Sequence, residues 1–368
     1  MAIQHETNPP YTDAGPRDEL RRAPSDATGF AGRAVFATRW GGPDVLRVAA
    51  RQVGPPAPDQ IVIEVEAAGV AFGDLLLREG LRRELRPPAI PGYDVAGVVR
   101  AVGSDVRDLR EGDNVAVWTG GSGGYATHVV APRAAAVRYP AGLAAASVTS
   151  LVLNYVTAWQ MLTRSAALAD GATILIHSAA GGVGSALLEL GALRGMTMFG
   201  TASAAKSDVV EQLGGIPIDY RSEDYAKRVR AEAPTGIDAV FDALGPASWK
   251  GALPLLRPGG HLVVYGLSSA FKNGRRNLPE LFGRLLRAPR TSYLTLFMKG
   301  VAVSGYNSGK VIPAHPDWFK QDLGRLIGLL ADGKIEPRIH HTFSLEGAGD
   351  AQRELGAGRA TGKIVLIP

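Results

Sequence analysis

A glycine-rich turn near the middle of the chain carries the clearest chemical signal. The apolar, β-branched run Thr173–Ser178 is typical of a strand, and a helical pattern begins directly after the turn. The turn itself consists of Ala180, Gly181, Gly182, Val183 and Gly184. Glycines let the backbone approach a phosphate closely, and a helix start offers free N–H groups and the positive end of its dipole. The turn therefore predicts a site for the pyrophosphate of a dinucleotide.

The residues after the next strand indicate which dinucleotide binds. A site for NAD carries an acidic residue about 20 residues past the turn, where it binds the ribose hydroxyl. Here Ser203 and Lys206 stand in that region instead. An ammonium and a hydroxyl suit the additional 2′-phosphate of NADPH. The sequence therefore predicts NADPH as the cofactor, and the alternative is that Lys206 is an ordinary solvated lysine.

The elements around the turn predict how it is positioned. From Thr173 onward, apolar runs alternate with helical patterns. The predicted strands are Thr173–Ser178, Thr197–Thr201, Pro217–Tyr220, Ala239–Ala243, His261–Tyr265 and Val301–Gly305. The predicted helices are Val183–Leu193, Ser207–Leu213, Glu223–Glu232, Ala247–Leu256 and Leu278–Leu286. Right-handed crossovers cover both faces of such a sheet, so the pattern predicts an α/β fold with a doubly wound, six-stranded parallel sheet. Gly245 and Gly266 follow the fourth and fifth strands, at the carboxyl edge where these sheets bind cofactors.

The chain on either side of this sheet has a different pattern. Residues 1–30 contain prolines and scattered charges without periodicity, which indicates a disordered tail. Short alternating strands follow at Ala34–Thr38, Val45–Arg51, Ile61–Val70, Val95–Val102 and Asn114–Trp118. The remaining predicted elements are the helices Ala145–Leu162 and Trp318–Leu330 and a final strand at Gly362–Ile367. We therefore predict a β-rich first domain that the C-terminal segment rejoins.

The composition excludes several classes of protein. With 20% charged residues, 46% apolar residues and a net charge of +5, the chain is expected to be soluble and not to bind nucleic acid. It has no cysteine, which excludes disulfides, thiolate catalysis and a cysteine-ligated metal. No apolar run reaches the ~18–20 residues that span a bilayer, and the N-terminus lacks a secretory pattern. We therefore expect a cytoplasmic protein without a transmembrane segment.

Three segments resemble the medium-chain dehydrogenase/reductase superfamily. They are Gly69–Asp74 with Arg78-Glu79-Gly80, Pro91–Val99 with Gly112-Asp113, and Ala179–Gly184. The chain looks like the zinc-free quinone oxidoreductase and enoyl reductase branch, and Gly200–Lys206 resembles the vesicle amine transport protein subgroup. The resemblance implies a Rossmann domain at residues 151–306 and a GroES-like catalytic domain at residues 31–150 and 307–368. It also implies that Tyr220 contacts the adenosine phosphate and that Gly245 and Gly266 line the nicotinamide half.

The metal positions of the related zinc alcohol dehydrogenases are changed in this chain. Those enzymes need a Cys where Ala71 stands and a Gly-His-Glu where Gly92-Tyr93-Asp94 stands. Alanine offers no ligand, and tyrosine offers no imidazole. The resemblance therefore implies no catalytic metal.

The candidate catalytic residues lie in the same segments. Family enoyl reductases place a Tyr shortly after the Arg-x-Gly element, but none follows here. Tyr93 is the nearest alternative donor to a substrate oxygen, and a packed aromatic is the other interpretation of it. Asp74 recurs in the family pattern, where it either fixes the site or stabilises a helix start. We also expect Tyr125, in a glycine-rich loop, to wall the pocket, and Asn154 and Thr157 to face the nicotinamide.

Hydride transfer without a metal relies on the cofactor, on substrate orientation and on electrostatics. The sequence therefore predicts an NADPH-dependent oxidoreductase that reduces a quinone or the double bond of an α,β-unsaturated carbonyl. One alternative is an enoyl thioester on coenzyme A or a carrier protein, whose anionic handle would bind Arg78, Arg82, Arg83 and Arg86. Another is a non-catalytic adaptor that holds NADPH. The apolar segment Tyr293–Gly305 ends in the sixth strand, which in the family pairs with its copy, so we expect a homodimer.

Two further patterns are set aside. Tyr306 and Lys310 have the spacing of a short-chain dehydrogenase pair, but the Asn-Ser-Gly between them predicts a turn rather than one helical face. His340-His341 has no acidic residue at a useful spacing, which favours a surface pair over a metal site.

Overall fold

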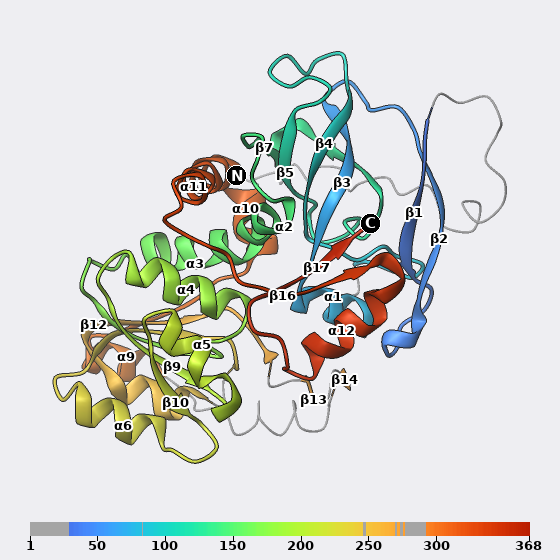
Figure 1. The fold of residues 1–368 in the computed structure, drawn as a ribbon. Coiled ribbons are helices and arrows are strands. Elements are labelled where there is room, and N and C mark those ends of the chain that lie inside the picture. Colours follow the sequence, from blue (N-terminus) through green and yellow to red (C-terminus); the bar gives the residue numbers. More distant parts are fainter. Residues whose placement is uncertain (1–28, 83, 246–247, 269–270, 273–274, 277–291) are drawn as a thin grey trace, which may run out of the picture.

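The computed structural model describes residues 29–368 apart from 83, 246–247, 269–270, 273–274 and 277–291. A parallel sheet with its helices occupies the lower left of Figure 1, and a largely antiparallel sheet occupies the upper right. The predicted tail 1–30 and the predicted helix Leu278–Leu286 lie almost wholly outside the described residues. Phe30, the last residue of that tail, already belongs to the first strand.

The parallel sheet confirms the predicted doubly wound fold. Its strands run in the order β10 (Ile216–Asp219), β9 (Thr197–Ala202), β8 (Thr173–His177), β11 (Ile237–Asp242), β12 (Leu256–Val264) and β15 (Ala302–Gly305). All five neighbouring pairs are parallel. The connecting helices are α4 (Gly182–Ala192), α5 (Ser207–Gln212), α6 (Tyr225–Glu232), α7 (Trp249–Ala252) and α9 (Tyr293–Lys299). Strands β8 and β11 are almost completely buried because helices cover both faces of the sheet.

The second sheet is built from both ends of the chain. Its order is β16 (Ile339–Ser344), β17 (Lys363–Ile367), β3 (Gln60–Val70), β4 (Asp94–Val102), β5 (Asn114–Trp118) and β7 (Ala136–Arg138), and β6 (His128–Pro132) also pairs with β3. The C-terminal strand β17 is antiparallel to β3, so the end of the chain rejoins the first sheet as predicted. Beside this sheet lie the hairpin β1 (Phe30–Ala37) and β2 (Leu46–Val53), and the helices α1 (Phe72–Arg78) and α12 (Ala348–Gly356). Strands β6, β7 and β16 and helix α12 are absent from the sequence-based prediction; the three strands are short, with at most six residues each.

One helical stretch joins the two sheets. It runs through α2 (Ala145–Ser150), a π-helical turn at Leu151–Tyr155, α3 (Val156–Gln160) and a second π-helical turn at Met161–Ser165. The predicted domain boundary at residue 150 therefore falls inside continuous helix. Helices α10 (Ser308–Ala314) and α11 (Pro316–Ala331) follow β15, and α11 packs against α3. A small pairing of β13 (Phe271–Lys272) with β14 (Arg275–Arg276) completes the described strands.

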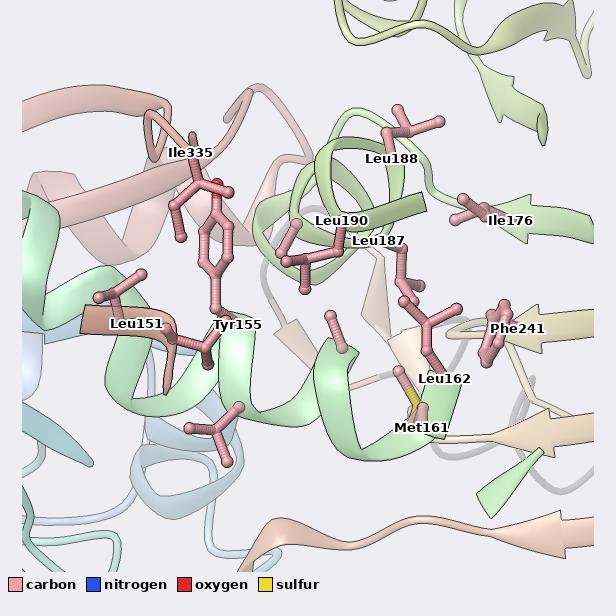
Figure 2. Close-up of a cluster of buried hydrophobic side chains, with 14 of the residues drawn as sticks. Leu151, Tyr155, Met161, Leu162, Ile176, Leu187, Leu188, Leu190, Phe241 and Ile335 are labelled. Carbon is pink, nitrogen blue, oxygen red and sulfur yellow. The ribbon is translucent and has the colours of Figure 1, made fainter. Parts of the chain in front are cut away.

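The core beneath the glycine turn fixes that helical stretch in place. Figure 2 shows Tyr155 and Leu162 pointing toward α4, whose Leu187 and Leu190 face them, and Leu151 belongs to the same buried cluster. All five side chains are at most 3% exposed. Burying an aliphatic side chain of this size stabilises a fold by about 1.5–3 kcal/mol. The contacts therefore hold α4, and with it the turn, against an element that reaches back to the first sheet.

Candidate functional site

The glycine turn has the geometry of a phosphate-binding helix start. Strand β8 ends at His177, Ser178 takes a φ of +58°, and α4 begins at Gly182. The first hydrogen bond of the helix runs from the Ser185 N–H to the Gly181 carbonyl at 2.8 Å. In the described part of the chain, the N–H groups of residues 182, 183 and 184 have no such acceptor, as expected for a first turn. They are the donors that the sequence assigned to a pyrophosphate.

Two of the glycines are required by close packing. A Cβ on Gly184 would lie 2.4 Å from the Ser178 carbonyl oxygen and 2.6 Å from that of Ala179. A Cβ on Gly182 would lie 2.5 Å from the Nδ2 atom of Asn154. Asn154 therefore contacts the turn, whereas the sequence assigned its side chain to the nicotinamide. Thr157 lies one turn later on the same stretch and is 5% exposed.

The loops after β11 and β12 bring Gly245 and Gly266 to the same edge of the sheet. Gly245 is buried with a φ of +102°, which favours glycine, and Gly266 is half-buried. A Cβ on Gly266 would lie 2.7 Å from the Ala243 carbonyl oxygen. The carboxylate of Asp242 holds the first loop by accepting from the Leu244 N–H and the Ser248 hydroxyl, each at 2.8 Å. Both glycines thus lie where a cofactor would cross the sheet.

Lys206 reaches across to the C-terminal segment, which the sequence did not indicate. Its Nζ donates to the carbonyl oxygens of Gly358 and Ala360 at 2.7 and 2.6 Å. Burial lowers the pKa of Lys206 from its ordinary value. An ammonium has three N–H donors, so one remains for a phosphate oxygen. Arg359, exposed between those two carbonyl groups, is a further cation at this edge that sequence reasoning missed.

The other two residues predicted for the adenosine end lie at the surface. Ser203 is half-buried directly before the short 3₁₀ turn Ala204–Lys206. Tyr220 follows β10 and is 55% exposed, with the Arg221 guanidinium 5.7 Å from its ring centroid. An exposed aromatic ring beside cationic groups can stack on a purine and tolerate a phosphate nearby. The assignment of Ser203 and Tyr220 to NADPH stays a prediction.

A buried ion pair ties the C-terminal strand to the sheet under the site. Lys363 Nζ lies 2.5 Å from Asp94 Oδ2, and the two side chains are 2% and 0% exposed. The neighbouring Gly362 N–H donates to the Ala180 carbonyl of the glycine turn at 3.0 Å. A Cβ on Gly69 would lie 2.3 Å from Asp94 Oδ2, so that glycine makes room for the pair. The two halves of the site are therefore joined through residues 362 and 363.

Asp74 and Tyr125 form a buried hydrogen-bond cluster. The Asp74 carboxylate accepts from the N–H groups of Ala71 and Gly92 at 2.8 Å and from the Tyr125 hydroxyl at 2.9 Å. Both side chains are 0% exposed, and burial raises the pKa of Asp74 to about 6. This placement corrects the expectation that Tyr125 walls the pocket, because its ring is covered and its hydroxyl is already engaged. Asp74 does both things that the sequence allowed: it stabilises the start of α1 and fixes the 92–125 region around it.

Tyr93 is held by an arginine that the sequence did not connect to it. Arg82 Nη1 donates to the Tyr93 hydroxyl and to the Gly121 carbonyl, both at 2.8 Å. Burial raises the pKa of Tyr93 to about 12, although Arg82 opposes the shift. Tyr93 is 9% exposed and the Arg82 side chain is 18% exposed. A charged donor and a protonated phenol therefore stand side by side.

The predicted anion-binding arginine cluster does not form. Arg78 is 0% exposed and donates to the Gln352 side chain at 2.7 Å and to the Gly41 carbonyl at 2.6 Å. It holds α1 against α12, so it cannot bind a handle at the surface. Arg82 is committed to Tyr93, Arg83 lies outside the described residues, and Arg86 is exposed. The four arginines look like one cluster in the sequence because their spacing does not show that the Arg78 side chain points into the interior.

The two patterns that were set aside, the Tyr306–Lys310 spacing and His340-His341, have different outcomes in the structure. Tyr306 precedes α10 and donates to Gln160 Oε1 at 2.7 Å, whereas Lys310 lies within α10, so they do not share a helical face. His340 does have an acidic partner, Glu354, at 3.3 Å, which the tertiary structure supplies from α12. Among the described residues, no group of three or more His, Cys, Asp or Glu side chains could hold a metal ion. In the same residues, every helix is too short or too polar to cross a membrane.

Known proteins resemble this chain over most of its length. The alcohol dehydrogenase GroES-like domain family matches residues 57–141, and the zinc-binding dehydrogenase family matches residues 213–366. The synaptic vesicle membrane protein VAT-1 homolog of Rattus norvegicus is 34% identical over 341 residues, which are 91% of this chain and 84% of that protein. A quinone oxidoreductase of Pseudomonas aeruginosa is 33% identical and is covered completely, against 92% of this chain.

Solved structures agree with these matches. The Escherichia coli quinone oxidoreductase complexed with NADPH superposes with a TM-score of 0.81 at 25% identity, covering 91% of this chain and 100% of that one. The human synaptic vesicle membrane protein VAT-1 homolog-like protein superposes with a TM-score of 0.80 at 26% identity, covering 92% and 98%. The similarity therefore includes both sheets.

Proposed function

We propose a function from the premise that this chain belongs to the quinone oxidoreductase and VAT-1-like branch of the medium-chain dehydrogenase/reductase superfamily. The relatives support an oxidoreductase of the medium-chain type with a nicotinamide cofactor. In our proposal the protein is an NADPH-dependent reductase of quinones or of the activated double bond of α,β-unsaturated carbonyls. Residues 151–306 bind the cofactor, and residues 31–150 with 307–368 complete the substrate side.

The preference for NADPH is supported above all by the environment of Lys206. Its ammonium is oriented by two carbonyl groups at 2.6 and 2.7 Å, which leaves one N–H for the 2′-phosphate. Arg359 and Ser203 flank it, and no acidic side chain takes the place that would favour NAD. The glycine turn would bind the pyrophosphate, and Asn154 would contact it from the opposite side.

When bound, NADPH supplies the hydride. The protein's own contribution is to orient the acceptor and to donate hydrogen bonds to the oxygen on which negative charge develops. The residues at the positions that bind zinc in the related alcohol dehydrogenases support a reaction without zinc. Ala71 has no ligand atom, and the Tyr93 hydroxyl accepts from the Arg82 guanidinium, a cation that would repel a metal ion.

A homodimer completes the proposal. Strand β15 lies at one end of the parallel sheet, and α9 directly before it exposes Tyr293, Phe297 and Met298 by 85%, 77% and 74%. An open strand edge next to a large apolar surface favours association with a second copy. The family resemblance assigns the same edge to the dimer contact.

The test is NADPH oxidation measured across quinones, small enones and enoyl thioesters, with NADH as the control cofactor. We expect turnover with at least one acceptor and a clear preference for NADPH. Tight NADPH binding without turnover on any class would instead support the non-catalytic adaptor. A requirement for the thioester over the matching free enone would support a carrier-bound substrate.

A further inference from the structure

Arg82 occupies the stretch in which family enoyl reductases carry a tyrosine donor, and the structure shows where its side chain points. Nη1 uses both of its N–H groups, on the Tyr93 hydroxyl and on the Gly121 carbonyl, each at 2.8 Å. Nε donates to Glu84 Oε1 at 3.0 Å. Three anchors from different parts of the chain thus fix the plane of the guanidinium.

Two sets of donors remain unused at this point. Within the residues that the structure describes, neither Arg82 Nη2 nor the Tyr93 O–H has a hydrogen-bond acceptor. The Tyr93 hydroxyl accepts from Arg82 but does not itself donate. Donors in such a partly buried place are nearly always satisfied, by the protein, by water or by a ligand. Neither donor is a buried unsatisfied atom, so an acceptor oxygen from outside the chain, of water or of a substrate, can reach both.

Two glycines make room for the pair. A Cβ on Gly73 would lie 2.3 Å from the Tyr93 hydroxyl oxygen. A Cβ on Gly121 would lie 2.6 Å from Arg82 Nη1 and 2.8 Å from Tyr93 Cε1. The start of α1 and the 119–124 loop therefore leave the space that the two side chains fill. Tyr93 also directly precedes Asp94, whose partner Lys363 follows the Gly362 that is bonded to the glycine turn, so the chain connects the Arg82–Tyr93 pair to the cofactor half through these residues.

We propose that Arg82 Nη2 and the Tyr93 hydroxyl together receive the carbonyl oxygen of the substrate, with Arg82 in the role of the tyrosine that this chain lacks. This inference rests on the proposed function. It assigns a binding place to the carbonyl oxygen that enones, enoyl thioesters and quinones share.

The step balances without a change in the charge of either residue. For an enone, hydride from NADPH forms a C–H bond at the β-carbon, and the π electrons move onto the carbonyl oxygen to give an enolate. Arg82 and Tyr93 donate hydrogen bonds to that oxygen and keep their protons. A proton from solvent then adds to the α-carbon, so the substrate is reduced by two electrons and the cofactor is oxidised to NADP⁺. A guanidinium stays charged throughout, and it makes the neighbouring phenol a stronger donor.

The proposal is tested with Arg82→Gln, Arg82→Lys and Tyr93→Phe, and with Arg86→Gln as a matched control at an exposed arginine. Each variant is first compared with wild type by thermal unfolding. Removing a charged donor to an oxyanion lowers kcat by about 100-fold or more, so we expect that loss for Arg82→Gln with the Kd for NADPH unchanged. Tyr93→Phe should lose about 10-fold, and Arg82→Lys should recover part of the loss.

A second measurement does not depend on turnover. The phenolate of p-nitrophenol resembles the enolate oxygen, and its visible absorption reports how much of the bound dye is ionised. With NADP⁺ present, wild type and Arg86→Gln should bind the phenolate in preference to neutral nitrobenzene, and Arg82→Gln should lose that preference. If wild type turns over and Arg82→Gln keeps both its kcat and its binding of the phenolate, this inference is overturned but the proposed function is not. Absence of turnover by wild type on every acceptor would overturn the proposed function.

Discussion

Replacing Lys363 by methionine tests how strongly the buried ion pair under the site supports the fold. Methionine keeps the length of the side chain but leaves the Asp94 carboxylate, which is 0% exposed, without its partner. Removing one member of a buried pair costs about 3–5 kcal/mol, whereas replacing both with uncharged groups is often close to neutral. We therefore expect Lys363→Met to lower the free energy of unfolding by about 3–5 kcal/mol. The double variant Asp94→Asn/Lys363→Met should recover most of that loss.

The pH dependence provides an independent check of the same pair. Burial raises the pKa of Asp94 above its ordinary 3.8, and Lys363 acts in the opposite direction. Without Lys363 the pKa of Asp94 should therefore rise further. A carboxyl whose pKa is raised in the folded state stabilises the fold below its unfolded pKa, and this contribution is lost as pH rises through the folded value. The deficit of Lys363→Met should accordingly be smallest near about pH 4 and larger at neutral pH.

The assay is urea unfolding of wild type, both single variants and the double variant at several pH values. Lys334→Met serves as the control, because Lys334 forms an exposed pair with Asp332 and should contribute at most about 1 kcal/mol. The Kd for NADPH is measured in parallel, since Lys363 follows the Gly362 that is bonded to the glycine turn. If each single variant lowers the free energy of unfolding by less than about 1 kcal/mol and the two losses add up in the double variant, Asp94 and Lys363 do not stabilise the fold as a coupled pair.

Four further predictions concern the cofactor site, the buried acid and the dimer edge. Lys206→Ala should weaken NADPH binding at least about tenfold and leave NADH nearly unchanged in a fluorescence titration; equal losses would remove the 2′-phosphate assignment. Gly184→Ala should abolish NADPH binding because the added Cβ meets two backbone carbonyl groups. Gly182→Ala should bind NADPH more tightly than Gly184→Ala, because its Cβ meets only the movable end of the Asn154 side chain. Weaker NADPH binding by Gly182→Ala than by Gly184→Ala would contradict this. Asp74 has a pKa of about 6 in the folded protein, so its stabilising contribution is lost as pH rises through that value. The free energy of unfolding of wild type relative to Asp74→Asn should therefore fall by ~2–3 kcal/mol between acid and neutral pH. A difference that does not change with pH would refute this. Phe297→Asp should convert the dimer to a monomer in light scattering, and a wild type that is already monomeric would refute the proposed edge contact.

Local patterns in the sequence predicted the nucleotide-binding half of the fold well. The spacing of apolar residues shows whether a strand or a helix would bury them on one side. That spacing can be recognised within a segment of about 5–15 residues. Gly181 and Gly184 were recognisable for the same reason, since the backbone atoms that a Cβ would meet there lie only a few residues away, whereas Gly182 packs against the side chain of Asn154. Strands β6, β7 and β16 were missed because short strands are set by the neighbours with which they pair rather than by their own pattern.

The glycine turn, the parallel sheet that carries it and the lack of cysteine chemistry could all be predicted from the sequence. The partners of the charged residues, by contrast, follow only from the folded structure. Lys206 meets carbonyl groups 152 and 154 residues away, and Lys363 meets Asp94 across 269 residues. Arg78 and Arg82, four residues apart, separate into a buried structural role and a place beside Tyr93. Such pairings depend on which side chains the fold removes from water and brings face to face, and no spacing along the chain encodes that geometry.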